Sequence, residues 1–287
     1  MRFYSLLRWR IVCRQQYYDI SFIILTWNSA EYIDKCLESI DTLCSFKVKI
    51  HVIDNGSRDN TPLILREMQG KLQHVKLETI FLSENRGTTV SRNMGIRNAV
   101  KDSKYLCILD SDTVINEAAM QRLVKTLEND PKIGIVGPMM KGLDGKVQNS
   151  GRGIPTFKLK LLKVMPVMSL RRRGEQLEVI PKTKNITTVG YLMSACWMLS
   201  TKLVEKIGLL DERIFYAPED VEYCMRAWKN GYKVCYDRDA VIIHAWQRLS
   251  RKKLLSKHNW EHLKGLMYLF HKYNCYFRMP DYINYNE

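Results

Sequence analysis

The fold is decided by residues 19–57, DISFIILTWNSAEYIDKCLESIDTLCSFKVKIHVIDNGS, which predict a strand, a helix and a second strand in succession. The apolar run 19–25 is typical of a strand buried on both faces. Ser29 can cap a helix whose apolar residues recur at helical spacing up to residue 40. Residues 48–53 are rich in β-branched side chains, which favour a strand. The unit therefore predicts a parallel pair of strands joined by a helix.

The same alternation continues along the chain. The further predicted elements are a helix at 61–70, a strand at 75–82, a helix at 88–101, strands at 104–109 and 132–136 with a helix at 116–129 between them, a helix at 218–230 and strands at 232–236 and 240–244. Residues 142–186 hold Gly, Pro and many basic residues, and we expect a long loop or small insertion there. This order predicts an α/β fold, a mostly parallel Rossmann-like sheet flanked by helices with right-handed crossovers. A basic, aromatic-rich helix at 252–273 is expected to extend it at the C-terminal end.

Charge and composition limit the partners and the cellular location that can be expected. The chain has 287 residues, 46% of them hydrophobic, and a net charge of +15. The positive charge is concentrated in residues 1–18, 152–185 and 248–287, which suits an anionic partner such as membrane headgroups, a lipid diphosphate or nucleic acid; ordinary solvated surface charge is the alternative. Without an apolar run of about 20 residues or a clear signal peptide, we expect a cytoplasmic protein or one peripheral at the inner face of the plasma membrane. The eight cysteines include no Cys-x-x-Cys pair and are expected to be reduced thiols.

Polar, turn-forming residues follow each of the first four predicted strands. In open parallel sheets, ligands bind outside the carboxyl ends of the strands, so these residues are expected to share one rim. They are Thr26, Trp27 and Asn28 after the first strand, Asp54 to Ser57 and Asp59 after the second, Glu84 to Gly87 after the third, and Asp110, Ser111 and Asp112 after the fourth. Any one of these groups is ordinary loop composition, but four in succession predict a site for a polar ligand.

Three constellations carry candidate chemistry, and the first of them lies on this rim. Asp110 and Asp112 can hold a hard divalent cation, Mg²⁺ or Mn²⁺, which would neutralise a diphosphate leaving group; helix capping is the alternative. Glu219 and Asp220 open a helix, where the helix dipole favours acids, but a carboxylate there can also act as a general base. His244 closes an apolar strand and is either a structural histidine or a third metal ligand.

The order of these pieces resembles that of the family-2 glycosyltransferases, especially the bacterial rhamnosyl- and galactofuranosyl-transferase-like branch. The matching stretches are FIILTWNSAEYIDKCLESI (22–40), HVIDNGSRDNT (51–61), LSENRGTTVSRNMGI (82–96), YLCILDSDT (105–113), PEDVEYCMRAWKNGYKV (218–234) and AVIIHAW (240–246). The resemblance implies a GT-A type fold over residues 19–246, with a basic N-terminal segment at 1–18, a basic C-terminal tail at 247–287 and the acceptor approaching near 142–186.

The resemblance also implies roles for single residues. Thr26, Asn28 and Asp54 would hold the nucleoside of a nucleotide-sugar donor. Asn85, Arg92 and Asp110 would line the donor pocket. Asp110, Asp112 and His244 would bind the metal. Glu219 and Asp220 would form the catalytic pair, with Asp220 as the general base.

The function that follows is inverting transfer of a hexose or deoxyhexose to a hydroxyl of a glycan or polyprenyl-diphosphate-linked acceptor, in cell-surface polysaccharide synthesis. One alternative is a nucleotidyltransferase that forms the sugar nucleotide, but TWNSAEY lacks the Gly-rich basic loop expected for a triphosphate. Another is a basic nucleic-acid-binding protein, although no zinc finger, helix-turn-helix or RNA-binding signature is present and no nucleic-acid partner is expected.

Overall fold

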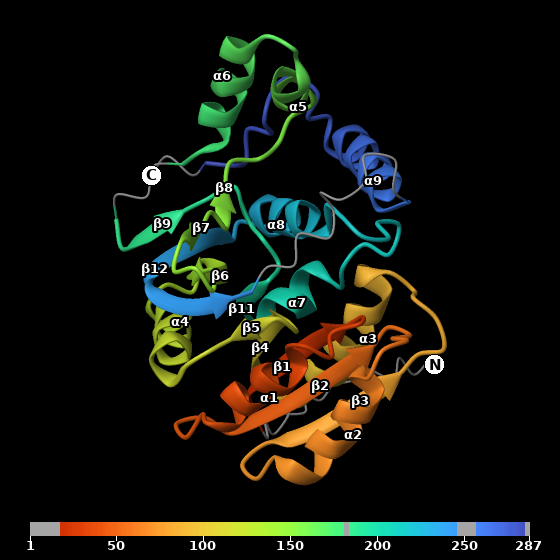
Figure 1. The fold of residues 1–287 in the computed structure, drawn as a ribbon. Helices are drawn as coiled ribbons and strands as arrows, with labels where there is room; N and C mark the ends of the chain where they lie inside the picture. Colours follow the sequence, from red (N-terminus) through yellow and green to blue (C-terminus); the bar gives the residue numbers. More distant parts are fainter. Residues whose placement is uncertain (1–17, 181–183, 246–256, 285–287) are drawn as a thin grey trace, which may run out of the picture.

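The computed structural model describes residues 18–180, 184–245 and 257–284. Within them a ten-stranded sheet runs through the molecule in the order β3-β2-β1-β4-β11-β6-β12-β5, with β7 and β9 at its margins (Figure 1). The strands are β1 (Tyr18–Thr26), β2 (Val48–Asp54), β3 (Lys76–Phe81), β4 (Ser103–Asp110), β5 (Thr113–Val114), β6 (Ile133–Lys141), β7 (Val147–Gln148), β9 (Ile186–Thr188), β11 (Cys196–Ser200) and β12 (Lys233–His244), while β8 (Gly151–Arg152) and β10 (Tyr191–Leu192) form a separate pair.

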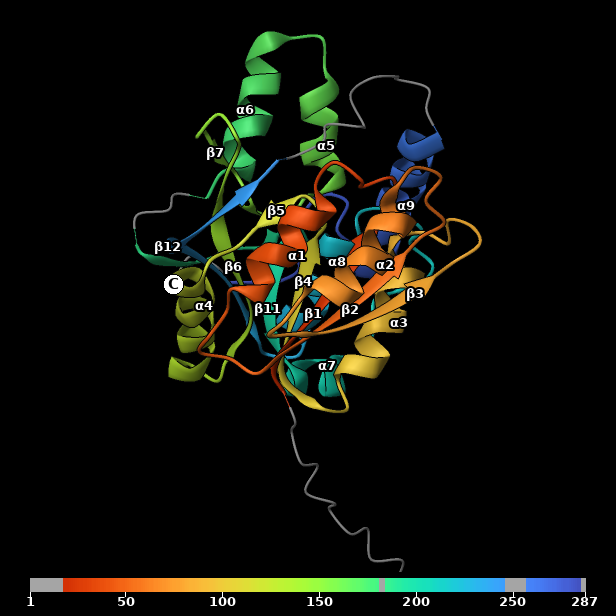
Figure 2. The same cartoon turned by 60° about the horizontal axis from the view of Figure 1, so that its bottom comes forward.

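Helices cover both faces of the sheet. The helices are α1 (Ile33–Asp41), α2 (Thr61–Lys71), α3 (Thr88–Ala99), α4 (Glu117–Asn129), α5 (Phe157–Val164), α6 (Met168–Glu178), α7 (Thr201–Ile207), α8 (Glu219–Lys229) and α9 (Lys257–Tyr273). Apolar side chains of α1, α2 and α4 join one buried cluster, and those of α3, α7, α8 and α9 join another on the opposite face (Figure 2). Strand β1 supplies Phe22 to the first cluster and Ile23 to the second, as expected for a strand buried on both sides.

The predicted fold class is confirmed. Strands β3, β2, β1 and β4 are mutually parallel, and β12 is parallel to β6, while β11 lies antiparallel between β4 and β6. The register aligns the strand ends, since Thr26 pairs with Asp54 and Leu25 pairs with Asp110. Alignment of these three carboxyl ends brings their polar continuations to one rim, as the sequence predicted.

Residues 142–186, where a long loop or small insertion was expected, carry regular structure rather than a long loop. They contain the hairpin of α5 and α6, the short strands β7 and β8, and the first residue of β9. The Thr156 side chain caps α5 by accepting from the Leu159 amide, and the Phe157 ring packs edge-on against Phe270 and Tyr276. The sequence pattern was weak because α5 is short and its packing partners lie more than 100 residues away.

The two strands predicted at 232–236 and 240–244 are a single strand, β12. Its register against β6 shifts between Asp237 and Val241, where a bulge absorbs the polar residues that resembled a turn. Asp237 is fully buried there and accepts hydrogen bonds from Arg122 and Thr126 of α4. Ser29 does not cap α1 through its side chain, because α1 begins four residues later, after Tyr32.

The C-terminal helix is present as α9 from Lys257, and the earlier part of its predicted span lies outside the described residues, as do Cys13 and most of the basic segment 1–18. Lys272 of α9 donates to Asp211 and to the fully buried Glu222 of α8, each at 2.7 Å. Burial opposes ionisation of Asp211, but hydrogen bonds from Arg213, Lys272 and Tyr268 outweigh it and hold its pKa well below the usual range. Charged contacts therefore fasten α9 to the rest of the fold.

The described helices include none that combines the length and the apolar character needed to cross a bilayer.

Candidate active site

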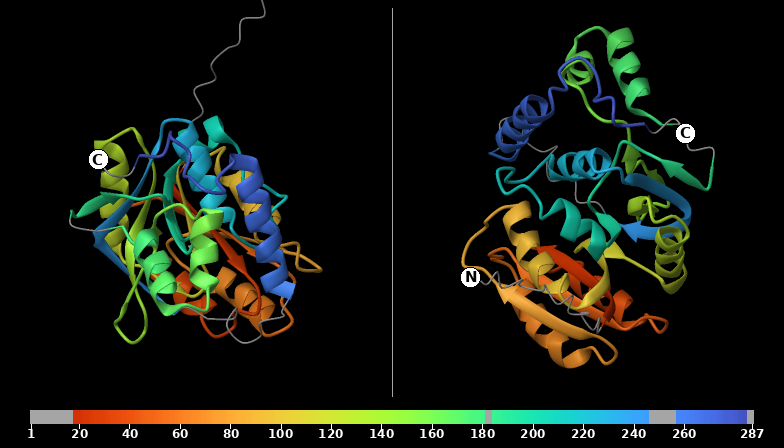
Figure 3. Two further views of the ribbon diagram at one scale, coloured as in Figure 1. Left: turned by 90° about the horizontal axis from the view of Figure 1, so that it is seen from above. Right: turned by 180° about the vertical axis from the view of Figure 1, so that it is seen from behind.

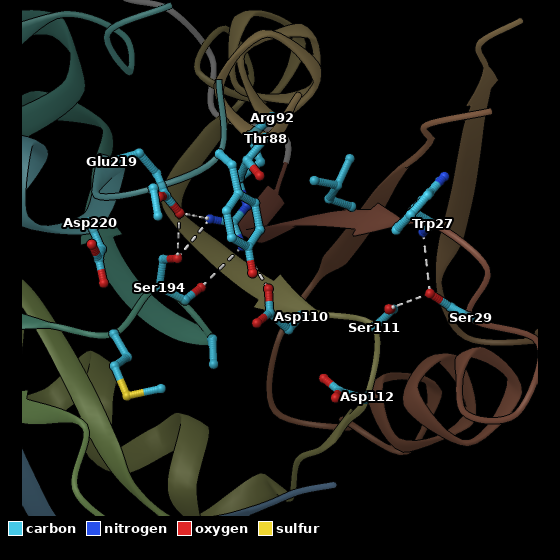
Figure 4. A pocket seen from close by; sticks show the side chains of 15 residues that line it. Trp27, Ser29, Thr88, Arg92, Asp110, Ser111, Asp112, Ser194, Glu219 and Asp220 are labelled. Atoms are coloured by element: carbon cyan, nitrogen blue, oxygen red, sulfur yellow. Dashed lines mark hydrogen bonds and ion pairs between the residues drawn. The ribbon is translucent and has the colours of Figure 1, made fainter. Parts of the chain in front are cut away.

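A cavity of about 320 Å³ opens where β1 and β4 end and α8 begins (Figure 4). The polar residues that the sequence singled out contribute much of its lining: Arg92, Asp110, Ser111, Asp112, Glu219 and Asp220. A second cavity of about 280 Å³ adjoins it and shares Leu25, Trp27, Thr88 and Tyr216 with the first. Acids from positions near 110 and 220 thus converge on one site, as predicted.

Asp110, Asp112 and His244 form a group that could hold a metal ion. One ligand atom of each lies within 4.8 Å of the others. Asp110 ends β4, and the pairing of β5 with the end of β12 brings His244 beside Asp112, with His244 Nε2 3.3 Å from Asp112 Oδ1. The Ala245 amide also donates to the Asp112 carbonyl, which fixes the end of β12 at this point.

The hydrogen bonds of His244 suit a metal ligand. The Gln148 side-chain amide donates its Nε2–H to the His244 carbonyl, so its Oε1 faces His244 Nδ1 at 2.6 Å. With Nδ1–H donated to that oxygen, Nε2 faces the Asp112 carboxylate, and either a proton or a metal ion can lie between the two atoms. A hydrogen bond to the second ring nitrogen, as here from Nδ1, commonly orients metal-bound histidines. The donor set therefore fits a divalent ion with oxygen and imidazole ligands.

The pKa shifts of His244 and Asp110 share one cause, the charge of the neighbouring Asp112. Burial lowers the pKa of His244, but the hydrogen bond and the charge of Asp112 outweigh burial and raise it. Burial raises the pKa of Asp110, Arg92 opposes this, and the neighbouring Asp112 charge adds to the rise. The negative charge of Asp112 thus raises the pKa of both groups, and a bound cation would offset that charge.

Arg92 connects the two acidic sides of the cavity. Its guanidinium is buried and lies 2.6 Å from Asp110 Oδ1 and 3.2 Å from Glu219 Oε1, and it also donates to Ser194 Oγ at 2.8 Å. The resemblance assigned Arg92 to the donor pocket, and it does line the cavity, but these hydrogen bonds engage its guanidinium with protein groups. Arg92 therefore lies where it can fix the distance between the Asp110–Asp112–His244 group and the start of α8.

Glu219 and Asp220 occupy different environments in the first turn of α8. The Glu219 side chain is 7% exposed and accepts from Arg92 and Ser194. Burial, with the Asp220 charge adding to it and Arg92 opposing, raises the pKa of Glu219 to about 7. Asp220 is half-buried at the cavity wall, and its Oδ1 accepts from the Val221 amide. Burial raises the pKa of Asp220, while that amide lowers it. Of the two acids, Asp220 has the carboxylate that a substrate can reach.

Three residues predicted to hold the nucleoside lie beside the two cavities rather than in their lining. Thr26 and Asp54 are buried and bonded to each other, with Thr26 Oγ1 donating to Asp54 Oδ1 at 3.0 Å, and Ser57 also donates to Asp54. Asn28, at φ 53°, accepts from the Arg58 amide. None of the three lines either cavity. Asn85 does line the second cavity, where it accepts from Asn55 and the Gly87 amide.

Two aromatic residues that the sequence reasoning left without a role line both cavities. Trp27 follows β1 directly, and Tyr216 lies two residues before Pro218. The chain at Phe215 is held against Gly87, because the Thr88 amide donates to the Phe215 carbonyl at 2.7 Å. A Cβ at Gly87, whose φ is +85°, would lie 2.4 Å from that carbonyl oxygen, so glycine is required there. Trp27 could have been found as the aromatic at the first strand end, whereas Tyr216 and Ser194 carry no sequence signal.

Residues 21–208 match the model of the family described as glycosyl transferase family 2, and the chain belongs to that family. Its GT-A fold is shared by two solved structures. The first is a mannosyltransferase from Pyrobaculum calidifontis in complex with GDP-Man and Mn²⁺, at 19% identity over 92% of this chain and 66% of that chain, with a TM-score of 0.62. The second is S. aureus TarS residues 1–349 in complex with UDP-GlcNAc, at 19% identity over 82% of this chain and 62% of that chain, with a TM-score of 0.57.

Curated relatives are similar over most of this chain. The poly-beta-1,6-N-acetyl-D-glucosamine synthase of Staphylococcus aureus (strain COL) is 29% identical over 218 residues, which are 76% of this chain. The low-salt glycan biosynthesis hexosyltransferase Agl10 of Haloferax volcanii is 26% identical over 228 residues, or 78% of this chain and 66% of that protein. The chain spans 48% of the length of the synthase. Neither name belongs to the rhamnosyl- or galactofuranosyl-transferase branch, which therefore stays a prediction.

Proposed function

We propose that this chain transfers a sugar from a nucleotide-sugar donor to a hydroxyl of a glycan or polyprenyl-diphosphate-linked acceptor, with inversion at the anomeric carbon, in the synthesis of a cell-surface polysaccharide. The observation that carries the proposal is the single cavity that joins the Asp110–Asp112–His244 group to the accessible carboxylate of Asp220. The relatives named for glycan synthesis and the nucleotide sugars in the titles of the neighbouring structures support it.

The two adjoining cavities suit the two halves of a nucleotide sugar. Trp27 and Tyr216 offer partly exposed aromatic rings on which a nucleobase can pack. The exposed Asn85, at the rim of the second cavity, offers its side-chain NH₂ for hydrogen bonds, while its oxygen accepts from Asn55. The nucleoside then lies beside Trp27, and the sugar lies toward Asp220. In this arrangement Thr26 and Asp54, which are buried and bonded to each other, fix the loop that carries Trp27 rather than contact the donor.

A divalent ion, Mg²⁺ or Mn²⁺, held by Asp110, Asp112 and His244 would neutralise negative charge on the departing nucleoside diphosphate. The remaining chemistry belongs to the protein. Asp220 accepts the proton of the acceptor hydroxyl while the bond from that oxygen to the anomeric carbon forms and the bond from the anomeric carbon to the diphosphate breaks. A single attack from the side of Asp220, opposite the diphosphate, inverts the configuration. Arg92, bonded to Asp110 and Glu219, holds the two sides of the cavity at the required spacing.

Thermal denaturation in the presence of nucleotides tests the proposal. A ligand that binds only the folded state raises the melting temperature by mass action. We expect stabilisation by one nucleoside diphosphate and its sugar conjugate, with uridine and guanosine diphosphates as first candidates, and a larger effect with Mn²⁺ or Mg²⁺ than with EDTA. The rhamnose and galactofuranose conjugates belong in the same screen, beside those of N-acetylglucosamine and mannose. No stabilisation by any nucleotide, with or without metal, would overturn the assignment.

A further inference from the structure

Figures 1 and 3 show that the α5–α6 hairpin and α9 lie at the same end of the molecule, beyond the sheet. The start of α5 contacts the last turns of α9 and the segment that follows α9. The Phe157 ring centroid is 5.9 Å from that of Phe270, and the Lys158 amide donates to the Tyr276 carbonyl at 2.9 Å. The position of the hairpin is thus fixed by α9 and the segment that follows it, and the turn between α5 and α6 projects outward.

Large apolar side chains are exposed on both elements. On the hairpin they are Leu161, Val167 and Met168, and on α9 they are Trp260, Leu263 and Met267, all between 43% and 60% exposed. The α9 residues recur at intervals of three and four, so they form one stripe along the outer face of that helix. Val167 and Met168 occupy the turn and the start of α6, at the projecting end. Apolar side chains grouped at one end in this way mark an interaction surface rather than scattered exposure.

Cationic side chains flank the apolar side chains of the hairpin. Residues 157–173 contain six Lys or Arg and no acid. Lys158, Arg171, Arg172 and Arg173 are exposed, whereas Lys160 and Lys163 pair with Glu178 inside the hairpin. Apolar side chains flanked by Lys and Arg match the interface of a bilayer, where the apolar groups enter the acyl boundary and the cations contact anionic headgroups. The backbone of a nucleic acid would satisfy the cations but would leave Val167, Met168 and Leu263 without an apolar partner.

The helix that carries the apolar stripe also adjoins the candidate active site through its opposite side. Helix α9 touches the peptide that leads into α8, since a Cβ built on Gly265 would lie 2.2 Å from the Ala217 carbonyl oxygen. Glu261 of α9 lines the second cavity. A bilayer in contact with the hairpin and the outer face of α9 would therefore lie close to the α8 side of the active site, where Asp220 meets the acceptor.

We propose that the α5–α6 turn and the outer face of α9 form a docking surface for an anionic lipid bilayer, and that the acceptor hydroxyl is carried by a lipid-linked sugar presented from that bilayer. The docking rests on the surface itself; only the acceptor class rests on the proposed function. In this proposal, residues 142–186, which were expected on the acceptor side, hold the enzyme at the bilayer in which such an acceptor resides.

Co-sedimentation with vesicles tests the docking. The full chain should bind vesicles that contain 30% phosphatidylglycerol in phosphatidylcholine at least ten-fold more tightly than vesicles of phosphatidylcholine alone, and salt should weaken the binding. The double variant Val167→Glu/Met168→Glu should lose most of this affinity. Leu63→Glu is the matched control, because Leu63 is 55% exposed near the start of α2, at the other end of the molecule (Figure 1). It should bind within two-fold of the parent.

A matched pair of triple variants tests how much the charge of the hairpin contributes to vesicle binding. Each cation near an anionic surface contributes roughly five-fold in affinity, so Arg171→Glu/Arg172→Glu/Arg173→Glu should weaken binding by about 100-fold or more. The triple variant Lys101→Glu/Lys125→Glu/Lys202→Glu carries the same charge change at exposed positions outside the surface and should lose much less. Equal losses in both triple variants, equal binding to neutral and anionic vesicles, or no loss in the Val167/Met168 variant would overturn the proposal.

Two further measurements separate the possible failures. Binding to duplex DNA that depends on the three arginines, together with vesicle binding insensitive to Val167 and Met168, would make the surface a nucleic-acid site and refute the bilayer. Nucleotide-dependent thermal stabilisation of the same variants reports on the donor site alone, and we expect it to be unchanged. Lost vesicle binding with retained nucleotide stabilisation isolates the docking residues, whereas vesicle binding without any nucleotide effect would leave the docking intact and refute the proposed function.

Discussion

Asp220→Asn removes the proposed general base with little other change. Asparagine keeps an oxygen that can accept from the Val221 amide, so the first turn of α8 should remain as it is. A general base contributes roughly 10²–10⁴ in rate. Burial raises the pKa of Asp220 and so makes its carboxylate a stronger base, which places the expected loss in the upper part of that range, about 10³–10⁴. At 1.36 kcal/mol per decade, the loss corresponds to roughly 4–5 kcal/mol in the activation barrier.

The assay is release of nucleoside diphosphate at saturating donor and acceptor, with the donor chosen by thermal denaturation. Nucleotide affinity, measured by calorimetry with Mn²⁺, should stay within about two-fold, because Asp220 is outside the Asp110–Asp112–His244 group. The neighbouring acid is the matched control. Glu219→Gln keeps an oxygen that can accept from Arg92 and Ser194, so we expect roughly a ten-fold loss. Turnover of Asp220→Asn within ten-fold of the parent, or a larger loss in Glu219→Gln, would refute this division of roles.

Three further predictions follow from the described contacts. Asp112→Asn should weaken nucleoside diphosphate binding at least ten-fold in Mn²⁺ and leave binding in EDTA unchanged, as measured by calorimetry; equal affinities in Mn²⁺ would refute the metal site. Gly265→Ala should lower the free energy of unfolding by about 1–3 kcal/mol and reduce turnover, whereas Gly70→Ala, on a helix with open space around it, should be neutral or stabilising by denaturant titration. Asp211, whose native pKa is depressed, stabilises the fold above the unfolded value of about 4, and this stabilisation is lost as the pH falls toward the native pKa. Asp211→Asn should therefore cost roughly 2–3 kcal/mol at pH 7 and less at pH 3.

The donor side of the site could be predicted from sequence because it is built from local units. Each strand of the first half ends in its own polar turn, and a parallel sheet places those ends on one rim without further information. Asp110 and Asp112 could therefore be located from the apolar strand that precedes them, and Asp220 could be located from a recognisable helix start. Thr26 and Asp54 could be located at the strand ends in the same way, but the hydrogen bond between them could not be predicted from the sequence.

The remaining features depend on contacts that a one-dimensional pattern does not contain. The bridge from Arg92 to Glu219 joins residues 127 positions apart, and the hydrogen bond from Gln148 Nε2 to the His244 carbonyl joins residues 96 positions apart. The α5–α6 hairpin was hidden for a similar reason: Gly, Pro and basic residues made it resemble a loop, and its packing partners lie in α9 and the segment after it. A short helix stabilised by distant packing has little signal of its own.

This division between local and distant contacts has a consequence for specificity. The candidate donor contacts come largely from loops after strands in the first half of the chain, which follow the register of the parallel sheet. The surface proposed for the acceptor side comes from α5, α6 and α9. The hairpin packs on α9 through Phe157 and Phe270, and α9 packs on the rest of the fold through its buried apolar side chains and through Lys272. Substitutions in the hairpin can therefore alter how the acceptor is presented without moving Asp110 or Asp112. We expect hairpin variants to change the KM for a lipid-linked acceptor in vesicles while the KM for the nucleotide sugar stays constant, and a parallel change in both would show that the two sides are mechanically coupled through Arg92.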